Sequence, residues 1–119
     1  MPKTKLRSNI IIVIVILLFA GAMWFYYPSK TGSATLSWSA NTESDLAGYK
    51  IYYSATPRTG TCPPGGYPQK VDVGNKTSYA IDKLEKGRAY YFSITSYDAT
   101  GNESCFSSEV KKIISTPKN

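Results

Sequence analysis

Two cysteines are the residues of this chain with the most specific chemical potential: Cys62, in the stretch TGTCPPGGYPQ, and Cys105. A cysteine nucleophile needs a neighbouring base, and a zinc site needs three or four ligands. The sequence contains no histidine and only these two cysteines, so neither a nucleophile nor a zinc site is expected. In a small domain outside the cytoplasm, two cysteines most often pair. We therefore expect a disulfide between Cys62 and Cys105.

Four carboxylates near two predicted turns are the other candidates for chemistry. Residues 98–102 provide too few oxygen ligands for a calcium loop, and no further group supports glycoside hydrolysis by a carboxylate pair. Solvated turn residues are the simpler interpretation. No catalytic residue, cofactor or metal site is expected, and the chain is not expected to be an enzyme. The four residues are Glu43, Asp45, Asp98 and Glu103.

The charge of the chain is divided unevenly along its length. The formal net charge is +6, but Lys3, Lys5 and Arg7 lie in the first nine residues. From Lys30 onward the net charge is +3, and the basic residues are spread rather than clustered. A nucleic-acid-binding surface requires a basic stripe with aromatic residues between the charges. No nucleic-acid partner is therefore expected.

Residues 10–27 follow this basic start and contain no charged side chain. As a helix, this stretch would be about 27 Å long, enough to cross a thin membrane. Its aromatic end, residues 24–27, would lie at the far interface, and the basic residues would stay in the cytoplasm. We therefore expect a single-pass signal-anchor helix, with the following domain tethered on the extracytoplasmic side, periplasmic or at the cell surface.

A cleaved signal peptide is the alternative interpretation of the same segment. Ala20, Gly21 and Ala22 form an A-x-A cleavage site after the apolar stretch. The mature chain would then begin at Met23 with four exposed aromatic residues, which is why the anchor is favoured. Cleavage near Ala22 would give a secreted or periplasmic protein, so both interpretations place the domain outside the cytoplasm.

Beyond the apolar segment, hydrophobic residues alternate with a period of two, as in half-buried antiparallel strands. The clearest runs are residues 34–40, 48–54 and 88–97, and weaker ones are 70–73, 77–84 and 109–114. Six short strands separated by turns predict an all-β sandwich. The expected organisation is a basic region 1–9, a membrane segment 10–27, a linker 28–33, a domain 34–115 and a tail 116–119.

Several motifs within these runs resemble the fibronectin type III family, especially its single-domain bacterial members. They are LSW around Trp38, the run NTESDLAGYKIYYS, the spacing of Leu84, Gly87 and Tyr90, and YFSITSYDATGNES. The resemblance implies an immunoglobulin-like sandwich in which Tyr90 ties a crossover to nearby backbone. The family's first strand has no clear counterpart before LSW. A missing first strand would leave a sheet edge to which another chain could add a strand.

In this fold, the aromatic residues divide into a core and a surface set. Trp38, Leu84, Tyr90 and Phe92 are expected in the core. Tyr52 and Tyr91 fall on the outward phase of neighbouring strands, and Tyr97 continues that phase. They could form cross-strand aromatic pairs, or a platform that binds a sugar ring or a partner protein. Tyr67 would join that surface from the loop that contains Cys62.

The family's topology places Cys62 between its third strand and the next, and Cys105 at the start of its last strand. These positions lie at opposite ends of an ordinary sandwich. A disulfide therefore requires residues 55–69 to fold back across the sheet face. We expect a non-catalytic binding or scaffolding module tethered to a membrane by residues 10–27, with an unidentified protein as partner. The alternative is a secreted polysaccharide-binding domain that uses exposed tyrosines.

Overall fold

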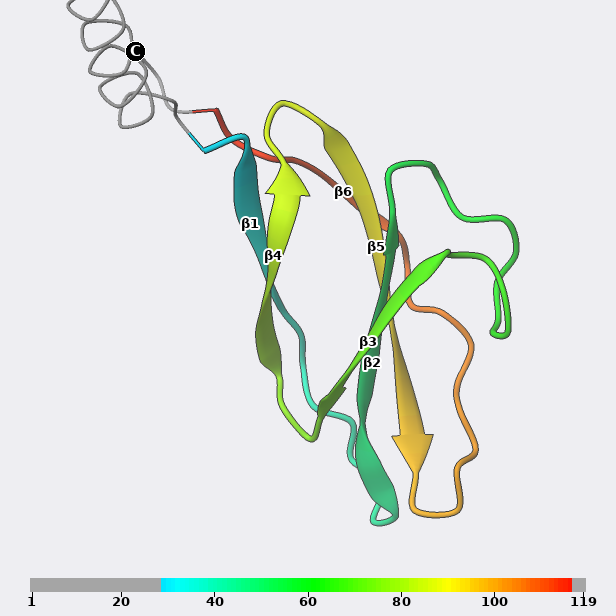
Figure 1. Ribbon diagram of the computed structural model, residues 1–119. Coiled ribbons are helices and arrows are strands. Elements are labelled where there is room, and N and C mark those ends of the chain that lie inside the picture. The colour runs from blue at the N-terminus through cyan, green and yellow to red at the C-terminus, as the bar shows by residue number, and fades with distance from the viewer. Residues whose placement is uncertain (1–28, 117–119) are drawn as a thin grey trace, which may run out of the picture.

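Between residues 29 and 116 the chain forms six strands, and each overlaps one of the six alternating runs (Figure 1). The structure is a computed structural model that describes residues 29–116. The predicted basic region, membrane segment and residues 117–119 of the tail lie outside the described residues. Within the described part of the chain, no helix long and apolar enough to span a membrane is found. The strands are β1 (Thr31–Ser37), β2 (Leu46–Ser54), β3 (Gln69–Gly74), β4 (Ser78–Glu85), β5 (Ala89–Asp98) and β6 (Val110–Ile113).

The strands form two antiparallel sheets, which confirms the predicted all-β sandwich. One sheet has the order β1-β4, and the other has the order β3-β2-β5-β6. β1 begins at Thr31, inside the segment 28–33 that the sequence suggests to be a linker. Thr31 and Gly32 pair with Glu85 and Leu84 of β4. The sequence gives no sign of this extension, because Thr31, Gly32 and Ser33 include no apolar side chain that could alternate with polar ones.

The core lies between the two sheets. Its buried cluster consists of Ala34, Tyr49, Ile51, Val73, Ile81, Leu84, Phe92 and Ile114. Of the four predicted core residues, Leu84 and Phe92 are fully buried, while Trp38 and Tyr90 are half-buried and pack against the cluster. The Trp38 ring meets the Tyr49 ring edge-on, with centroids 5.6 Å apart. The Tyr90 hydroxyl accepts a hydrogen bond from the Glu85 N–H at 3.0 Å, so it ties the β4–β5 crossover to backbone.

The last strand of the larger sheet is shortened in an unusual way. Before β6, the chain from Ser104 onward stays beside β5, but two N–H groups of β5 donate there to serine hydroxyls instead of to backbone carbonyls. Ser104 Oγ accepts a hydrogen bond from the Ser96 N–H at 3.0 Å, and Ser107 Oγ accepts one from the Ile94 N–H at 2.9 Å. Regular pairing between β5 and β6 is thereby limited to four residue pairs.

Gly48 of β2 is required for the close approach of two neighbouring segments. A Cβ at this position would lie 2.5 Å from Tyr97 Oη and 2.9 Å from the backbone carbon of Gly74. We expect Gly48→Ala to lower the free energy of unfolding by about 1–3 kcal/mol through overpacking, as measured by urea denaturation. In a Tyr97→Ala background the same change should cost less, because only the Gly74 contact remains. An unchanged free energy of unfolding would contradict this account.

Candidate binding surface

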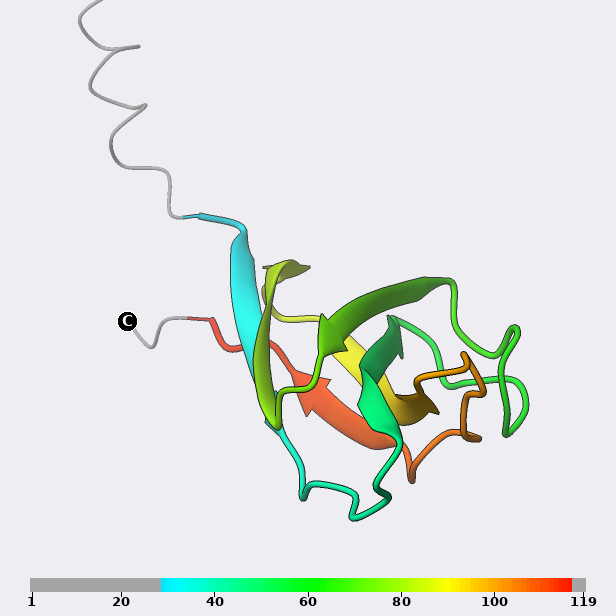
Figure 2. The ribbon, with the colours of Figure 1, turned by 90° about the horizontal axis from the view of Figure 1, so that it is seen from below.

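The loop between β2 and β3, residues 55–68, folds back over the outer face of the larger sheet. Figure 2 shows it lying beside the segment that joins β5 to β6. Under this cover, three polar residues of the outer face are buried although they point away from the core: Ser54, Ser93 and Thr95. The sheet therefore has a second buried layer on its outer side.

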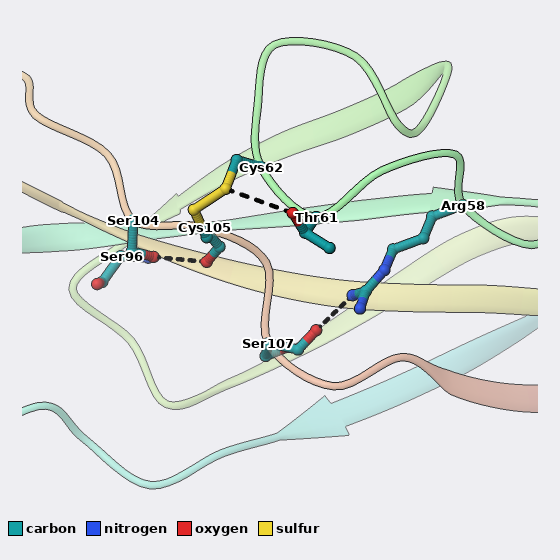
Figure 3. The surroundings of a disulfide bond; sticks show 7 residues. All are labelled: Arg58, Thr61, Cys62, Ser96, Ser104, Cys105 and Ser107. Carbon is teal, nitrogen blue, oxygen red and sulfur yellow. Dashed lines mark hydrogen bonds between the residues drawn. A yellow bond between two sulfur atoms is a disulfide. The ribbon is translucent and has the colours of Figure 1, made fainter.

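A disulfide between Cys62 and Cys105 holds the loop in place (Figure 3). It confirms the predicted pairing. Next to it, the Phe106 N–H donates a hydrogen bond to the Thr61 carbonyl at 2.8 Å. Both cysteines are exposed, so the bond lies at the surface and pins the loop from outside. We call residues 55–68, held in this way, the stapled loop.

Three aromatic rings form the apolar part of the layer beneath the stapled loop. Phe106 meets Tyr52 and Tyr67 edge-on, with ring centroids 4.9 Å and 5.2 Å away, respectively. Tyr52 and Tyr67 are themselves 6.2 Å apart. The Arg58 guanidinium lies 5.9 Å from the Phe106 ring, within the range of a cation–π contact. One ring comes from β2, one from the loop and one from the segment before β6, so the cluster joins all three.

Glu103 is the centre of a first polar network in this layer. Its Oε1 accepts hydrogen bonds from the Tyr52 hydroxyl and from Thr95 Oγ1, both at 2.6 Å, and Lys50 Nζ lies 3.4 Å from its Oε2. Burial alone would raise the pKa of Glu103, but these hydrogen bonds and the Lys50 charge outweigh it and lower the pKa. Burial, and then the Glu103 carboxylate, raise the pKa of Tyr52. The carboxylate therefore stays ionised and the phenol stays neutral at neutral pH.

Glu109 anchors a second network at the other end of the layer. Its Oε2 accepts hydrogen bonds from the Tyr67 hydroxyl and, at 2.9 Å, from the Arg58 N–H. The Arg58 Nη1 donates to Ser93 Oγ at 3.1 Å and to the Ser107 carbonyl at 2.6 Å. Burial, together with the hydrogen bond to Glu109, raises the pKa of Tyr67. The stapled loop is thus attached through side chains as well as through the disulfide.

The prediction that Tyr52 and Tyr67 are exposed is wrong. Tyr52 is only 4% exposed, because the stapled loop covers it. Tyr67 is only 8% exposed, because it points from that loop towards Ser93 of the sheet. The expected cross-strand pairing of tyrosines is also absent, since Tyr52 faces Ser93 and Tyr91 faces Ser54. Tyr91 is half-buried, with Lys111 Nζ 5.9 Å from its ring, and the half-buried Tyr97 donates a hydrogen bond to Asp72 Oδ1 at 2.8 Å. The four tyrosines do not form a common platform.

A hollow of about 300 Å³ lies between the stapled loop and the sheet. Aromatic rings, prolines and two charged residues surround it: Tyr52, Pro63, Pro64, Gly65, Tyr67, Pro68, Lys70 and Glu103. Sequence reasoning did not find Arg58, Phe106 and Glu109 as parts of this surface. Their only sequence signal is their position in, or next to, the segments that the two cysteines join.

The four candidate carboxylates line another hollow, of about 290 Å³, at one end of the sandwich. Hydrogen bonds from the Asn102 and Thr100 side chains, and from the Asn102 backbone, lower the pKa of Asp98 to about 2. Glu103 is engaged with the Tyr52 network, so the carboxylates serve different local partners. Among residues 29–116, no cluster of three or more potential ligands could hold a metal ion.

Comparison with known proteins gives the family of the chain. The model of the fibronectin type III domain matches residues 26–112. A Kelch domain-containing protein of Saccharolobus solfataricus is 32% identical over 78 residues, which cover 66% of this chain and 9% of that protein. The chain thus spans less than a tenth of that relative's length, and no solved structure matches. This match, together with the two sheets and the hydrogen bond between Tyr90 and the Glu85 N–H, shows that the chain belongs to the fibronectin type III family.

Proposed function

We propose that this chain is a non-catalytic binding or scaffolding module that presents the stapled loop to a partner protein outside the cytoplasm. Fibronectin type III domains commonly serve as binding modules and are typically non-catalytic. The observation that carries the proposal is the double attachment of this loop, by the disulfide and by the hydrogen bonds of Arg58 and Tyr67 to Glu109. A loop that is already ordered loses little conformational entropy when a partner binds.

The hollow beside the stapled loop suggests how a partner would be held. Its walls combine Tyr52 and Tyr67 with three prolines, and its two charged residues are Lys70 and Glu103, of which Glu103 is already paired with Lys50. Aromatic and apolar walls of this kind suit a single projecting side chain from a partner. An aliphatic or aromatic anchor residue would fit, with an acidic neighbour placed near Lys70.

Tethering to a membrane is the second part of the proposal. Residues 10–27 are uncharged and follow three basic residues, which is the pattern of a signal-anchor. β1 begins at Thr31, so only a short connection would separate the domain from the membrane surface. The disulfide fits an oxidising compartment, which supports an extracytoplasmic location.

The polysaccharide-binding alternative loses its main support. Stacking on a sugar requires exposed ring faces, and Tyr52 and Tyr67 lie beneath or within the stapled loop. Tyr91 and Tyr97 are half-buried and each has a neighbour that occupies part of its surface, Lys111 and Asp72. Glycan binding that is abolished by Tyr91→Ala or Tyr97→Ala would restore this alternative.

Photo-cross-linking in the native cells tests the proposed function. A photoreactive residue in place of Thr59, exposed on the stapled loop, should cross-link to one partner, which co-purifies and can be identified. The same residue in place of Asp82, exposed on β4 of the opposite sheet, is the matched control and should not. Replacing both cysteines with serine should lower the Thr59 yield severalfold, because the part of the loop around Cys62 loses its covalent attachment while Glu109 still holds Arg58 and Tyr67. Equal yields from both positions would reject the loop as the binding surface.

A further inference from the structure

A second surface, separate from the stapled loop, lies at the free edge of β1. Among the described residues β1 pairs only with β4. The Trp38 N–H donates to the Thr77 carbonyl at 3.0 Å, which makes Trp38 and Thr77 a hydrogen-bonded pair of this ladder. Such pairs alternate with non-bonded ones in antiparallel sheets, and the register therefore directs the backbone groups of Thr35 and Ser37 away from β4. These groups can pair with one more strand.

This edge lacks the features that usually prevent strand addition. Natural sheet edges are protected by lysine, proline or bulges. β1 reads TGSATLS, with no charge and no proline, and its irregularity is confined to residues 32–34. The outer strand of the other sheet, β6, reads VKKI and carries two lysines. The free edge of β1 is therefore open for pairing along Thr35 and Ser37.

A groove accompanies the free edge. It consists of two hollows of about 290 Å³ and 360 Å³, one bordered by β1, β5 and β6 and the other by Trp38 and the segment before β6. They share Ser37, Ile94, Ser107 and Val110. The groove is open here because Ser104 and Ser107 bond β5 through their side chains, so that β6 starts only at Val110. Val110 is consequently 59% exposed.

The lining of the groove indicates the chemistry of its occupant. It includes the apolar residues Leu36, Phe92, Ile94 and Val110, one cation, Lys112, and no carboxylate. The occupant is thus apolar on one side and neutral or acidic rather than basic.

A second copy of this chain does not meet these requirements. Edge-to-edge pairing of two β1 strands would turn Gly32, Ala34 and Leu36 of the second copy towards the groove, while its Trp38, next on the same phase, is already packed against its own Tyr49. One leucine and two small residues leave hollows of this size largely unfilled. We propose instead that an extended segment of a partner protein adds to the edge of β1, with bulky apolar residues at alternate positions in the groove and an acidic residue near Lys112.

Two peptide libraries of identical composition test this proposal. In the first library, peptides of about nine residues, within the usual range of strand lengths, alternate an apolar residue (Leu, Ile, Val or Phe) with a polar one (Glu, Asp, Ser or Thr). In the second library, the same residues are in random order. The full-length protein, held in detergent micelles, should enrich the alternating library. The peptide that binds most tightly should shift the NMR signals of the Thr35 and Ser37 amides. It should lose affinity when alternate backbone amides are N-methylated, because these amides can then no longer donate hydrogen bonds to β1.

Two matched variants assign the binding to the groove. Val110→Glu introduces a carboxylate into the groove and should weaken the selected peptide about tenfold or more. Ile113→Glu makes the same change on β6 at a residue that is 61% exposed and lines neither hollow, and should leave affinity nearly unchanged. The variant in which both cysteines are replaced by serine should still bind the selected peptide.

Several results would overturn the proposal. One is the absence of enrichment from the alternating library, and another is an equal effect of Val110→Glu and Ile113→Glu. Protection of the Thr35 and Ser37 amides from hydrogen exchange in the free protein would show that a segment of the chain itself already occupies the edge. A dimer that Val110→Glu dissociates would show that a second copy does so.

Discussion

Replacing Cys62 and Cys105 together with serine is expected to lower the free energy of unfolding by about 4 kcal/mol. The two cysteines are 43 residues apart in the sequence. Closing a loop of that length restricts the unfolded chain, and the chain-entropy relation gives a loss of this size when the restriction is removed. Urea denaturation of the variant, compared with the oxidised protein, measures the difference. Wild-type protein in a thiol reductant should match the variant.

The native structure around the loop should largely survive this change. Glu109 still accepts hydrogen bonds from Tyr67 and from the Arg58 N–H, and Glu103 still accepts one from Tyr52. Chemical shifts of Thr95 and Ser93, which lie under the loop, should therefore stay close to those of the oxidised protein. A loss below about 1 kcal/mol would mean that the unfolded chain is already restricted by other contacts.

The strands can be predicted from the sequence because a half-buried strand alternates apolar and polar side chains along its own length. β2 and β5 carry apolar residues on one phase, and the structure extends the predicted runs by no more than a few residues. The disulfide between Cys62 and Cys105 could also be predicted, since the sequence contains no histidine and no further cysteine, which leaves pairing as the main option. The strand prediction depends on local composition, and the disulfide prediction depends on the composition of the whole chain and on the expected compartment.

The environment of Tyr52 could not be predicted in the same way. Alternation assigns it correctly to the outer face, but the outer face is covered here by a loop that has no periodic pattern. Glu103 presents the same difficulty, because it lies in a turn by sequence while its partners Lys50 and Tyr52 are 53 and 51 positions away. The second buried layer depends on these long-range contacts, which no single segment encodes.

Removing the Glu103 carboxylate should have the next largest effect on stability. Glu103→Ala leaves the hydroxyls of Tyr52 and Thr95 buried without their acceptor, and leaves Lys50 without its ion pair. A buried donor that loses its partner costs about 1–3 kcal/mol, and the partly exposed Lys50 can turn to solvent. We expect a total loss of about 3 kcal/mol in urea denaturation at neutral pH. Glu43→Ala, in an exposed turn, removes the same charge and is the control.

The pH dependence of stability distinguishes this network from simple packing. The pKa of Glu103 is lower in the folded protein than its ordinary value, so the folded state favours the ionised carboxylate. Its contribution is therefore present above the pKa of the unfolded chain and is lost as the pH falls through the folded-state pKa. Between about pH 5 and pH 3, wild-type protein should lose more stability than Glu103→Gln, which has no proton to gain. Parallel pH profiles for wild type and Glu103→Gln, with Glu43→Gln as reference, would contradict a stabilising role for the ionised carboxylate.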